Sequence, residues 1–183
     1  MNMKISIITI TYNSAKTLPN TLQSVLSQTY PHIEHIIVDG ASTDGTRELI
    51  EAYAKEVQKG KDECTREVRW VSEKDSGIYN AINKGIQMAT GDVIGFVHSD
   101  DMLFSADSIE HIANAFSSSD VDLIYGDLQY CKGDKVVRRW KSNAYNPCAL
   151  KYGWMPPHPT VYCKREVYEK VGLYDEWFHI SAD

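Results

Sequence analysis

Residues 4–13 read KISIITITYN, and residues 32–40 read HIEHIIVDG. Both stretches are rich in β-branched apolar residues and end in polar ones. Apolarity that is almost continuous predicts strands covered on both faces, as in a parallel sheet. Between the two stretches, Leu18, Leu22 and Leu26 recur at the spacing of an amphipathic helix. Two parallel strands need such a crossover, so this part of the sequence predicts a β-α-β unit.

The same alternation of strands and helices continues to residue 103. Ser14 is expected to cap the first helix, and Gly91 to end the third in the left-handed conformation. Ile78, Ile82 and Ile86 are expected to form the buried stripe of the third helix. Alternation of this kind implies an α/β fold with a mainly parallel, Rossmann-like central sheet sandwiched by helices. The further elements are a turn and helix at 41–57, a strand at 67–73, a helix at 75–91 and a strand at 92–101.

The pattern loosens after residue 104. We expect one more helix at 105–116 and then an antiparallel pair of strands, 121–130 and 135–140, around a KGD turn. Residues 146–160 form a long loop rich in aromatic residues and proline, and residues 160–183 predict a strand, a short helix and a turn. The sequence therefore predicts a small antiparallel part after the parallel sheet.

Composition argues against several classes of function. The chain has 183 residues and a formal net charge of -6, which does not favour binding to nucleic acid or to a membrane surface. Lys135, Arg138, Arg139 and Lys141 form the densest basic cluster, which we expect to be the exposed face of a strand. No signal peptide is evident, and no stretch reaches the ~18 apolar residues of a membrane helix. The four cysteines show no C-x-x-C pair, so we expect a reduced, cytoplasmic compartment.

Polar residues stand where the predicted strands end, and parallel sheets bind ligands at the carboxyl ends of their strands. The loop after the first strand reads TYNSAKT, without the glycines of a dinucleotide-binding loop or a P-loop. Asp100 and Asp101 could instead hold a diphosphate through a divalent cation, Mg²⁺ or Mn²⁺. Equally, Asp101 or Ser105 could cap the helix predicted at residues 105–116. Asp39 is either a turn residue of DGASTDG or a hydrogen-bond acceptor for a base or ribose.

Three stretches, read together, resemble the family 2 glycosyltransferases, which have the GT-A fold. The resemblance covers essentially the whole chain and implies a single GT-A domain over residues 1–183. Its nucleotide-sugar-binding half is expected at 1–103 and its acceptor-side half at 104–183. The stretches are ISIITITYNSAKTLPNTLQSVLSQTYPHIEHIIVDGASTDGT (5–46), DSGIYNAINKGIQMATGDVIGFVHSDD (75–101) and GLYDEWFHISAD (172–183).

The resemblance implies transfer of a sugar from a nucleotide sugar to an acceptor hydroxyl, with inversion at the anomeric carbon. A glycan or lipid-linked acceptor is implied, in the synthesis of a polysaccharide or another glycoconjugate, with peripheral association at the inner face of the membrane. Carried over by position, Thr11 and Tyr12 line the nucleotide site. Asp39 hydrogen-bonds the base, commonly uracil, and Asp75 lies in the segment that helps to hold the nucleotide or sugar.

His98-Ser99-Asp100 occupies the D-x-D position of the family. The resemblance implies that Asp100 coordinates the divalent cation, and that Asp101 lies beside it or contacts the sugar. It assigns the catalytic base to Asp183. Two positions depart from the pattern, because His98 replaces the first aspartate of D-x-D and Ala182 precedes Asp183 where the family often has glutamate.

The family normally continues into a helix beyond the position of Asp183, so we expect the chain to be a fragment. A non-catalytic module that binds a nucleotide sugar is therefore the alternative function. The loop KYGWMPPHPT would border the acceptor site, with Trp154 stacked on a sugar face and His158 near the diphosphate or the metal. Alternatively, Trp154 belongs to the core, and His158 only fixes the conformation of the loop.

Overall fold

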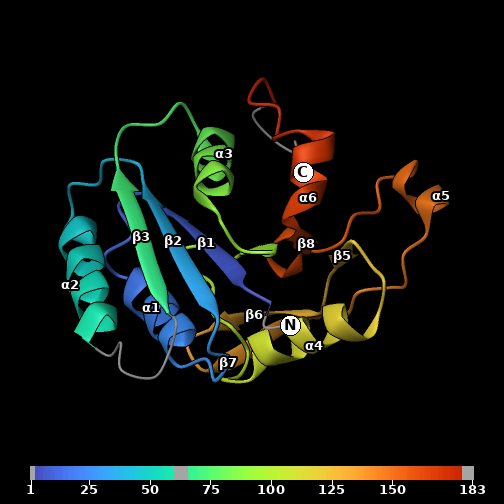
Figure 1. The fold of residues 1–183 in the computed structure, drawn as a ribbon, viewed down its shortest axis with the longest axis horizontal. Coiled ribbons are helices and arrows are strands. Elements are labelled where there is room, and N and C mark those ends of the chain that lie inside the picture. Colours follow the sequence, from blue (N-terminus) through green and yellow to red (C-terminus); the bar gives the residue numbers. More distant parts are fainter. Residues whose placement is uncertain (1–2, 60–65, 179–183) are drawn as a thin grey trace.

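The computed structural model describes residues 3–59 and 66–178. Six strands form one mixed sheet in the order β3-β2-β1-β4-β8-β5 (Figure 1). The four strands at one side of the sheet are mutually parallel, as the sequence predicts, and β8 joins β4 and β5 as an antiparallel neighbour. The strands are β1 (Ile5–Thr11), β2 (Ile33–Asp39), β3 (Glu67–Ser72), β4 (Val93–Phe96), β5 (Leu123–Ile124) and β8 (Tyr162–Lys164).

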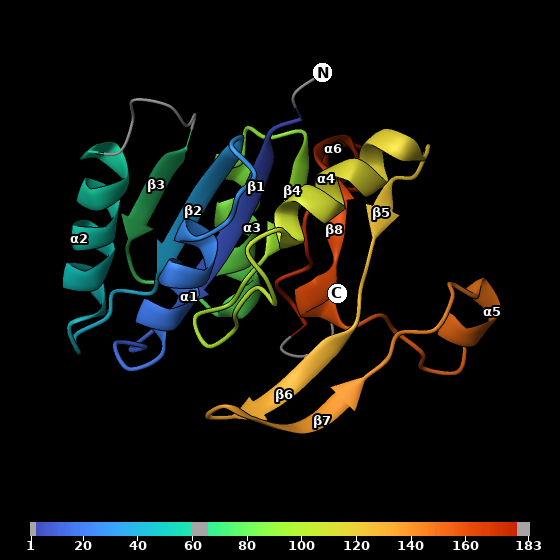
Figure 2. The same ribbon diagram turned by 90° about the horizontal axis from the view of Figure 1, so that it is seen from below.

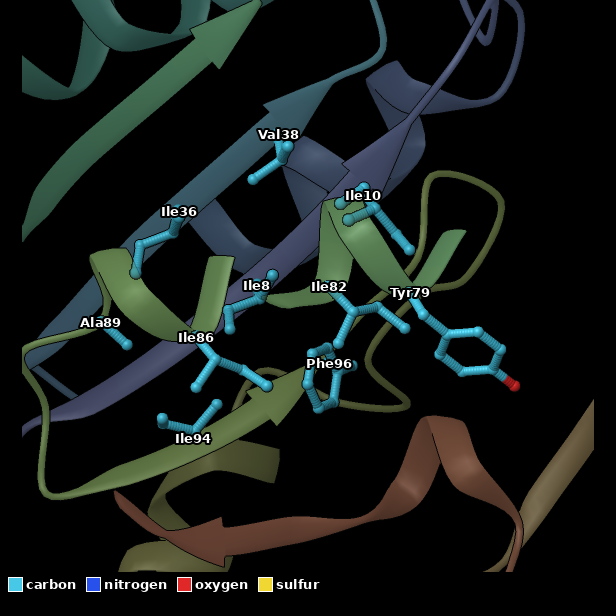
Figure 3. Packing of buried hydrophobic residues seen from close by; sticks show 11 residues of the cluster. Ile8, Ile10, Ile36, Val38, Tyr79, Ile82, Ile86, Ala89, Ile94 and Phe96 are labelled. Atoms are coloured by element: carbon cyan, nitrogen blue, oxygen red, sulfur yellow. The ribbon is translucent and has the colours of Figure 1, made fainter. Parts of the chain in front are cut away.

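Helices cover both faces of this sheet (Figures 1 and 2). On one face, α3 packs against β1, β2 and β4 (Figure 3). Tyr168 of α6 and Tyr174 of the following segment pack against the same cluster. On the other face, α1, α2 and α4 bury the alternate residues of the same strands, such as Ile7 and Ile37. The helices are α1 (Leu18–Leu26), α2 (Thr46–Lys59), α3 (Ile78–Met88), α4 (Ser108–Ser118), α5 (Pro147–Leu150), α6 (Arg165–Val171) and the 3-10 turn η1 (His158–Thr160).

The central strands are almost fully buried, which explains their continuous apolar runs. In α3 the expected stripe holds for Ile82 and Ile86, but Ile78 is 54% exposed and Tyr79 is buried in its place. A helix has 3.6 residues per turn, so an apolar residue at the first position can lie outside the stripe that its followers define.

Two predicted helix boundaries are wrong. Ser14 does not cap α1, because the helix begins at Leu18 and the Ser14 hydroxyl bonds the Tyr12 carbonyl and Ser99 instead. Gly91 does not adopt the left-handed conformation. Glycine is required there for space: a Cβ at this position would lie 2.6 Å from Ser6 Oγ and 2.8 Å from the Lys4 carbonyl oxygen.

The antiparallel pair around the KGD turn is confirmed, with β6 (Leu128–Lys132) and β7 (Lys135–Trp140) forming a separate two-stranded sheet. However, residues 121–130 are not one strand, because the chain leaves the main sheet after β5. The Gly126 carbonyl accepts hydrogen bonds from the hydroxyls of Thr160 and Ser142, which holds the chain at the point where it turns away. In residues 3–59 and 66–178, no helix combines the length and apolar composition needed to cross a membrane.

Candidate functional site

The loops that follow β1, β2 and β4 meet at the carboxyl end of the sheet and are joined by hydrogen bonds. Asn13, which has a φ of 49°, donates its backbone N–H to Ser42 Oγ at 2.7 Å. Its side-chain Oδ1 accepts from the Thr43 N–H at 2.9 Å. The Ser14 and Ser99 hydroxyls lie 3.0 Å apart, which connects the first loop to the loop that carries Asp100. Three loops distant in sequence thus form one surface.

Asp44 fixes the relative position of two of these loops, a role that the sequence analysis missed. Its carboxylate accepts from the Ala15 N–H at 2.9 Å and from the backbone and hydroxyl of Thr46 at 3.1 and 2.5 Å. The hydrogen bond from the Thr46 hydroxyl is the main cause that lowers the pKa of Asp44. The turn sequence DGASTDG was the available signal, because aspartate commonly bonds the backbone two residues on.

Asp39 is fully buried at the end of β2, and its carboxylate organises the following turn. Its Oδ2 accepts from the Ser42 N–H at 3.0 Å and from the Ser72 hydroxyl at 2.6 Å, while Oδ1 accepts from the Ser42 hydroxyl. The interpretation of Asp39 as a turn residue is therefore correct. Each carboxylate oxygen has two lone pairs, so Oδ1 retains the capacity to accept one more hydrogen bond. Its contact with a base remains a prediction.

Tyr12 and Asp75 are brought together beside Gly40. A Cβ at Gly40 would lie 2.8 Å from Asp75 Oδ2 and 3.2 Å from Tyr12 Cδ2, so glycine permits this close approach. Asp75 Oδ1 accepts from the Gly77 N–H at 3.0 Å. The side chain of Tyr12 is 66% exposed. The neighbouring Thr11 is buried, and its hydroxyl has no hydrogen-bond partner within the described part of the chain.

Asp100 and Asp101 lie in a tight turn that is hydrogen-bonded to α1 through Thr21. The Asp101 N–H donates to the His98 carbonyl at 3.0 Å, and the buried Thr21 hydroxyl donates to the Asp101 carbonyl at 2.8 Å. Neither Asp101 nor Ser105 caps the following helix, because α4 begins at Ser108 and its N-cap residue is Asp107. The capping alternative is therefore wrong for both residues.

The two aspartates differ in their environment. Asp100 is exposed, whereas Asp101 is half-buried. Burial, followed by the charge of Asp100, raises the pKa of Asp101, and a backbone hydrogen bond from His98 and the charge of His158 oppose the rise. A bound cation would favour the ionised form of Asp101. This pair of hard oxygen ligands fits Mg²⁺ or Mn²⁺, which are usually held by one or two carboxylates plus substrate phosphates.

Phosphate oxygens would have to complete such a site. Among residues 3–59 and 66–178, no group of three histidine, cysteine, aspartate or glutamate side chains is arranged to hold a metal ion. These described residues therefore supply an incomplete ligand set, which a diphosphate could complete.

His98 and His158 form a stack of rings next to the two aspartates. The ring centroids are 5.8 Å apart with an interplanar angle of 12°, and Phe96 stacks on His158 at 5.3 Å. The stack explains how histidine is accommodated where an aspartate was expected. It also brings His158, from the acceptor-side loop, close enough to influence Asp101.

Trp154 lies in a different aromatic group. Trp154 is half-buried, and its ring lies edge-on to Tyr125 at 6.0 Å and tilted to Tyr145 at 6.3 Å between ring centroids. The structure therefore brings His158, but not Trp154, into ring contact with the residues near the aspartate pair.

A second feature that the sequence analysis missed is a clasp between α3 and the segment after α6. The Asn83 amide donates to the Tyr174 carbonyl at 2.8 Å, and its Oδ1 accepts from the Tyr174 N–H at 2.9 Å. Glu176 accepts from Asn83 at 3.1 Å and from Asn80 at 3.0 Å, and these bonds lower the pKa of Glu176. The clasp fixes the chain seven residues before Asp183, which itself lies outside the described residues.

Comparison with known proteins relates both the sequence and the fold to sugar-transferring enzymes. A family model described as "Glycosyl transferase family 2" matches residues 6–180. A PGL/p-HBAD biosynthesis glycosyltransferase of Mycobacterium bovis is 29% identical over 97% of this chain and 66% of its own length. An uncharacterized glycosyltransferase of Mycobacterium tuberculosis is 31% identical over 98% of this chain and 65% of its own. The chain thus spans about two thirds of the length of these relatives.

Solved structures share the fold. S. aureus TarS 1-349 in complex with UDP has a TM-score of 0.74 at 20% identity, over 98% of this chain and 52% of that one. The mannosyltransferase PcManGT from Pyrobaculum calidifontis, in complex with GDP-Man and Mn²⁺, has a TM-score of 0.71 at 20% identity, over 94% of this chain and 48% of that one. These likenesses establish a GT-A-like arrangement of the sheet and its helices.

Proposed function

The chain belongs to glycosyl transferase family 2, and from this premise we propose that it transfers a sugar from a nucleoside diphosphate sugar to an acceptor hydroxyl. Inversion at the anomeric carbon and a uridine diphosphate donor are parts of the proposal. The observation that carries it is the close approach of Tyr12 and Asp75 beside Gly40, the residue that follows the buried Asp39, with the Asp100 loop joined to the loop after β1 through the Ser99 and Ser14 hydroxyls. A nucleotide sugar needs a base site and a diphosphate site side by side.

The base site is formed by the residues around Gly40. The exposed ring of Tyr12 offers a face on which a base can stack. The remaining acceptor capacity of Asp39 Oδ1 suits an imide N–H, and uracil carries one. The buried Thr11 hydroxyl, at the end of the neighbouring strand β1, is a further polar group beside Asp39. Asp75, next to Tyr12, would contact the nucleotide or the sugar.

Asp100 and Asp101 would hold Mn²⁺ or Mg²⁺ together with the diphosphate. When bound, the cation neutralises the negative charge that develops on the nucleoside diphosphate as it leaves. The half-buried position of Asp101 supports this role, because its charge interacts more strongly than it would in bulk water. PcManGT, whose structure contains GDP-Man and Mn²⁺, supports a cation for this fold.

We assign the proton transfer to Asp183. A carboxylate within about 3 Å of the acceptor hydroxyl can take its proton as it attacks, which typically contributes about 10²–10⁴-fold to the rate. Inversion requires a single in-line displacement, so one base is sufficient. Glu176 is not suited to this role, because three side chains of the α3 region, those of Ser76, Asn80 and Asn83, donate to its carboxylate. His158 and Trp154 would border the acceptor.

Thermal-shift measurements with UDP-, GDP- and dTDP-sugars, each with and without Mn²⁺, test the proposal. Binding to the folded state raises the melting temperature, by an amount that grows with ligand concentration over the dissociation constant. We expect the largest shift with a UDP-sugar and Mn²⁺. The absence of a shift with every nucleotide sugar would contradict the proposal. Binding without transfer, in a protein that includes the whole family-length sequence, would favour the non-catalytic module.

A further inference from the structure

The hairpin of β6 and β7 projects away from the six-stranded sheet as a two-stranded ribbon (Figure 2). Most of its residues are exposed, on both faces. Residues 128–141 carry one acidic side chain, Asp134, and five basic ones: Lys132, Lys135, Arg138, Arg139 and Lys141. The chain as a whole has a net charge of -6, so the ribbon has the opposite sign to the rest of the molecule.

These five cations have no carboxylate partner in the described part of the chain. Elsewhere on the surface, Lys4, Lys84 and Arg165 each lie within 4.0 Å of a glutamate oxygen. In the hairpin, the Arg138 guanidinium lies instead over the rings of Tyr130 and Trp140, at 5.4 and 5.7 Å. The charges of the hairpin are therefore available to an external anion.

The arrangement of charges also works against the stability of the hairpin. Lys132 and Lys135 are directly opposite each other across the two strands. Like charges at such positions destabilise a strand pair, and an isolated two-stranded hairpin is marginally stable in water. With both faces exposed, no core compensates the repulsion. An anionic surface placed against the hairpin would relieve it.

We propose that the β6–β7 hairpin docks on the anionic phospholipid surface of a membrane. The cations are interleaved with apolar and aromatic side chains, including Val137, which is 58% exposed, and Tyr130, which is 41% exposed. Such side chains partition into the interface between lipid and water, where lysine and arginine reach the headgroups through their long stems. This combination distinguishes an interfacial surface from a purely electrostatic one.

The shape of the molecule favours a bilayer over a soluble polyanion. A nucleic acid or an anionic polymer that followed the protein surface would meet the acidic remainder of the chain and be repelled. A planar bilayer meets the projecting hairpin first and leaves the acidic body in solvent (Figure 2). The overall charge of the chain therefore does not exclude a membrane surface, because the charge is unevenly distributed.

Vesicle co-sedimentation tests the proposal with the whole chain. The probes are vesicles of phosphatidylcholine alone and vesicles containing about one third phosphatidylglycerol. We compare the unmodified chain with Lys132→Gln/Lys135→Gln. The matched control is Lys55→Gln/Lys59→Gln, which removes the same charge from exposed positions on α2. Neutralising the opposed lysines removes their repulsion, so we expect the hairpin variant to be at least as stable as the unmodified chain.

We expect binding to the anionic vesicles only, reduced roughly tenfold or more in the hairpin variant and little changed in the α2 control. Raising the salt concentration to about 0.5 M should abolish the binding, because it screens the charges. Equal loss in both variants would overturn the proposal, and so would equal binding to uncharged vesicles. Binding to soluble polyphosphate without binding to vesicles would also overturn it. None of these outcomes depends on nucleotide binding, so the proposed function is tested separately.

Discussion

His35 is a fully buried histidine whose two ring nitrogens are both occupied. They lie 3.0 Å from Thr9 Oγ1 and 2.9 Å from the Tyr53 hydroxyl. Burial lowers the pKa of His35 from 6.5 to about 3. The unfolded chain therefore binds a proton below about pH 6.5 that the folded chain binds only near pH 3. The contribution of His35 to the free energy of unfolding is complete above about pH 6.5 and declines as the pH falls towards about 3.

We predict that lowering the pH from about 7 to about 5 reduces the free energy of unfolding by about 2 kcal/mol through His35 alone. In His35→Gln this contribution is absent, so the free energy of unfolding should depend less steeply on pH, whatever its value at neutral pH. Urea unfolding of both proteins at the two pH values measures the difference. Identical pH dependence in the two proteins would show that His35 is not held neutral.

Asp39 allows a prediction that separates its two roles. Asp39→Asn keeps the shape of the side chain, but its amide nitrogen cannot accept the hydrogen bonds that the carboxylate oxygens now receive. We expect a loss of stability of about 1–3 kcal/mol, because buried donors lose their acceptor. Affinity for UDP should fall as well if Asp39 also accepts from the base. Chemical unfolding and calorimetry report the two effects separately, and an unchanged stability would refute the turn role.

At the scale of elements, the clasp between α3 and the segment after α6 carries the clearest prediction. Asn83 is 5% exposed, and its amide bonds both backbone groups of Tyr174. Asn83→Ala leaves these groups without their partner, and we expect it to lower the free energy of unfolding by about 1–3 kcal/mol. Asn114→Ala on the exposed face of α4 is the matched control and should change stability little. Equal effects of the two substitutions in denaturant unfolding would contradict the clasp.

The elements differ in how far the sequence predicts them. The strands and helices of the first hundred residues follow from local periodicity, because β1, β2 and β4 are buried on both faces and each helix shows one apolar stripe. Gly91 was predicted for the wrong reason, since its requirement arises from the approach of the Lys4 backbone 87 residues earlier in the chain. The place of β8 between β4 and β5 is likewise set by pairing across the sheet, which no local pattern encodes.

At the scale of the whole molecule, the sequence correctly predicts that the strand ends carry the polar residues that meet. The topology of the sheet brings Tyr12 and Asp75 together beside Gly40. It also joins the loop that carries Ser99 to the loop after β1, which carries Ser14. The supporting contacts were not predictable, because Thr21, Asp44 and Asn83 act through partners distant in the sequence. Nothing in the sequence marks Thr21 or Asn83, whose residue types are common on helix surfaces. For Asp44 the turn sequence signals the bond to Thr46 but not the bond to Ala15.

The central claim is that these strand ends bind a nucleoside diphosphate through a cation held at Asp100. Calorimetric titration of UDP, with and without Mn²⁺, tests it in the unmodified chain and in Asp100→Asn. The matched control is Asp120→Asn, an exposed aspartate whose carboxylate lies 3.7 Å from Lys164 Nζ. Lys164 pairs with Val93 at the start of β4, so the control lies away from the carboxyl end of that strand.

We expect Mn²⁺ to increase the affinity of the unmodified chain and of the control for UDP. Asp100→Asn should reduce the Mn²⁺-dependent affinity roughly tenfold or more, which corresponds to about 1.4 kcal/mol. The melting temperature should change little, because Asp100 is exposed. An affinity for UDP in Mn²⁺ that is the same in Asp100→Asn as in the unmodified chain would contradict the account.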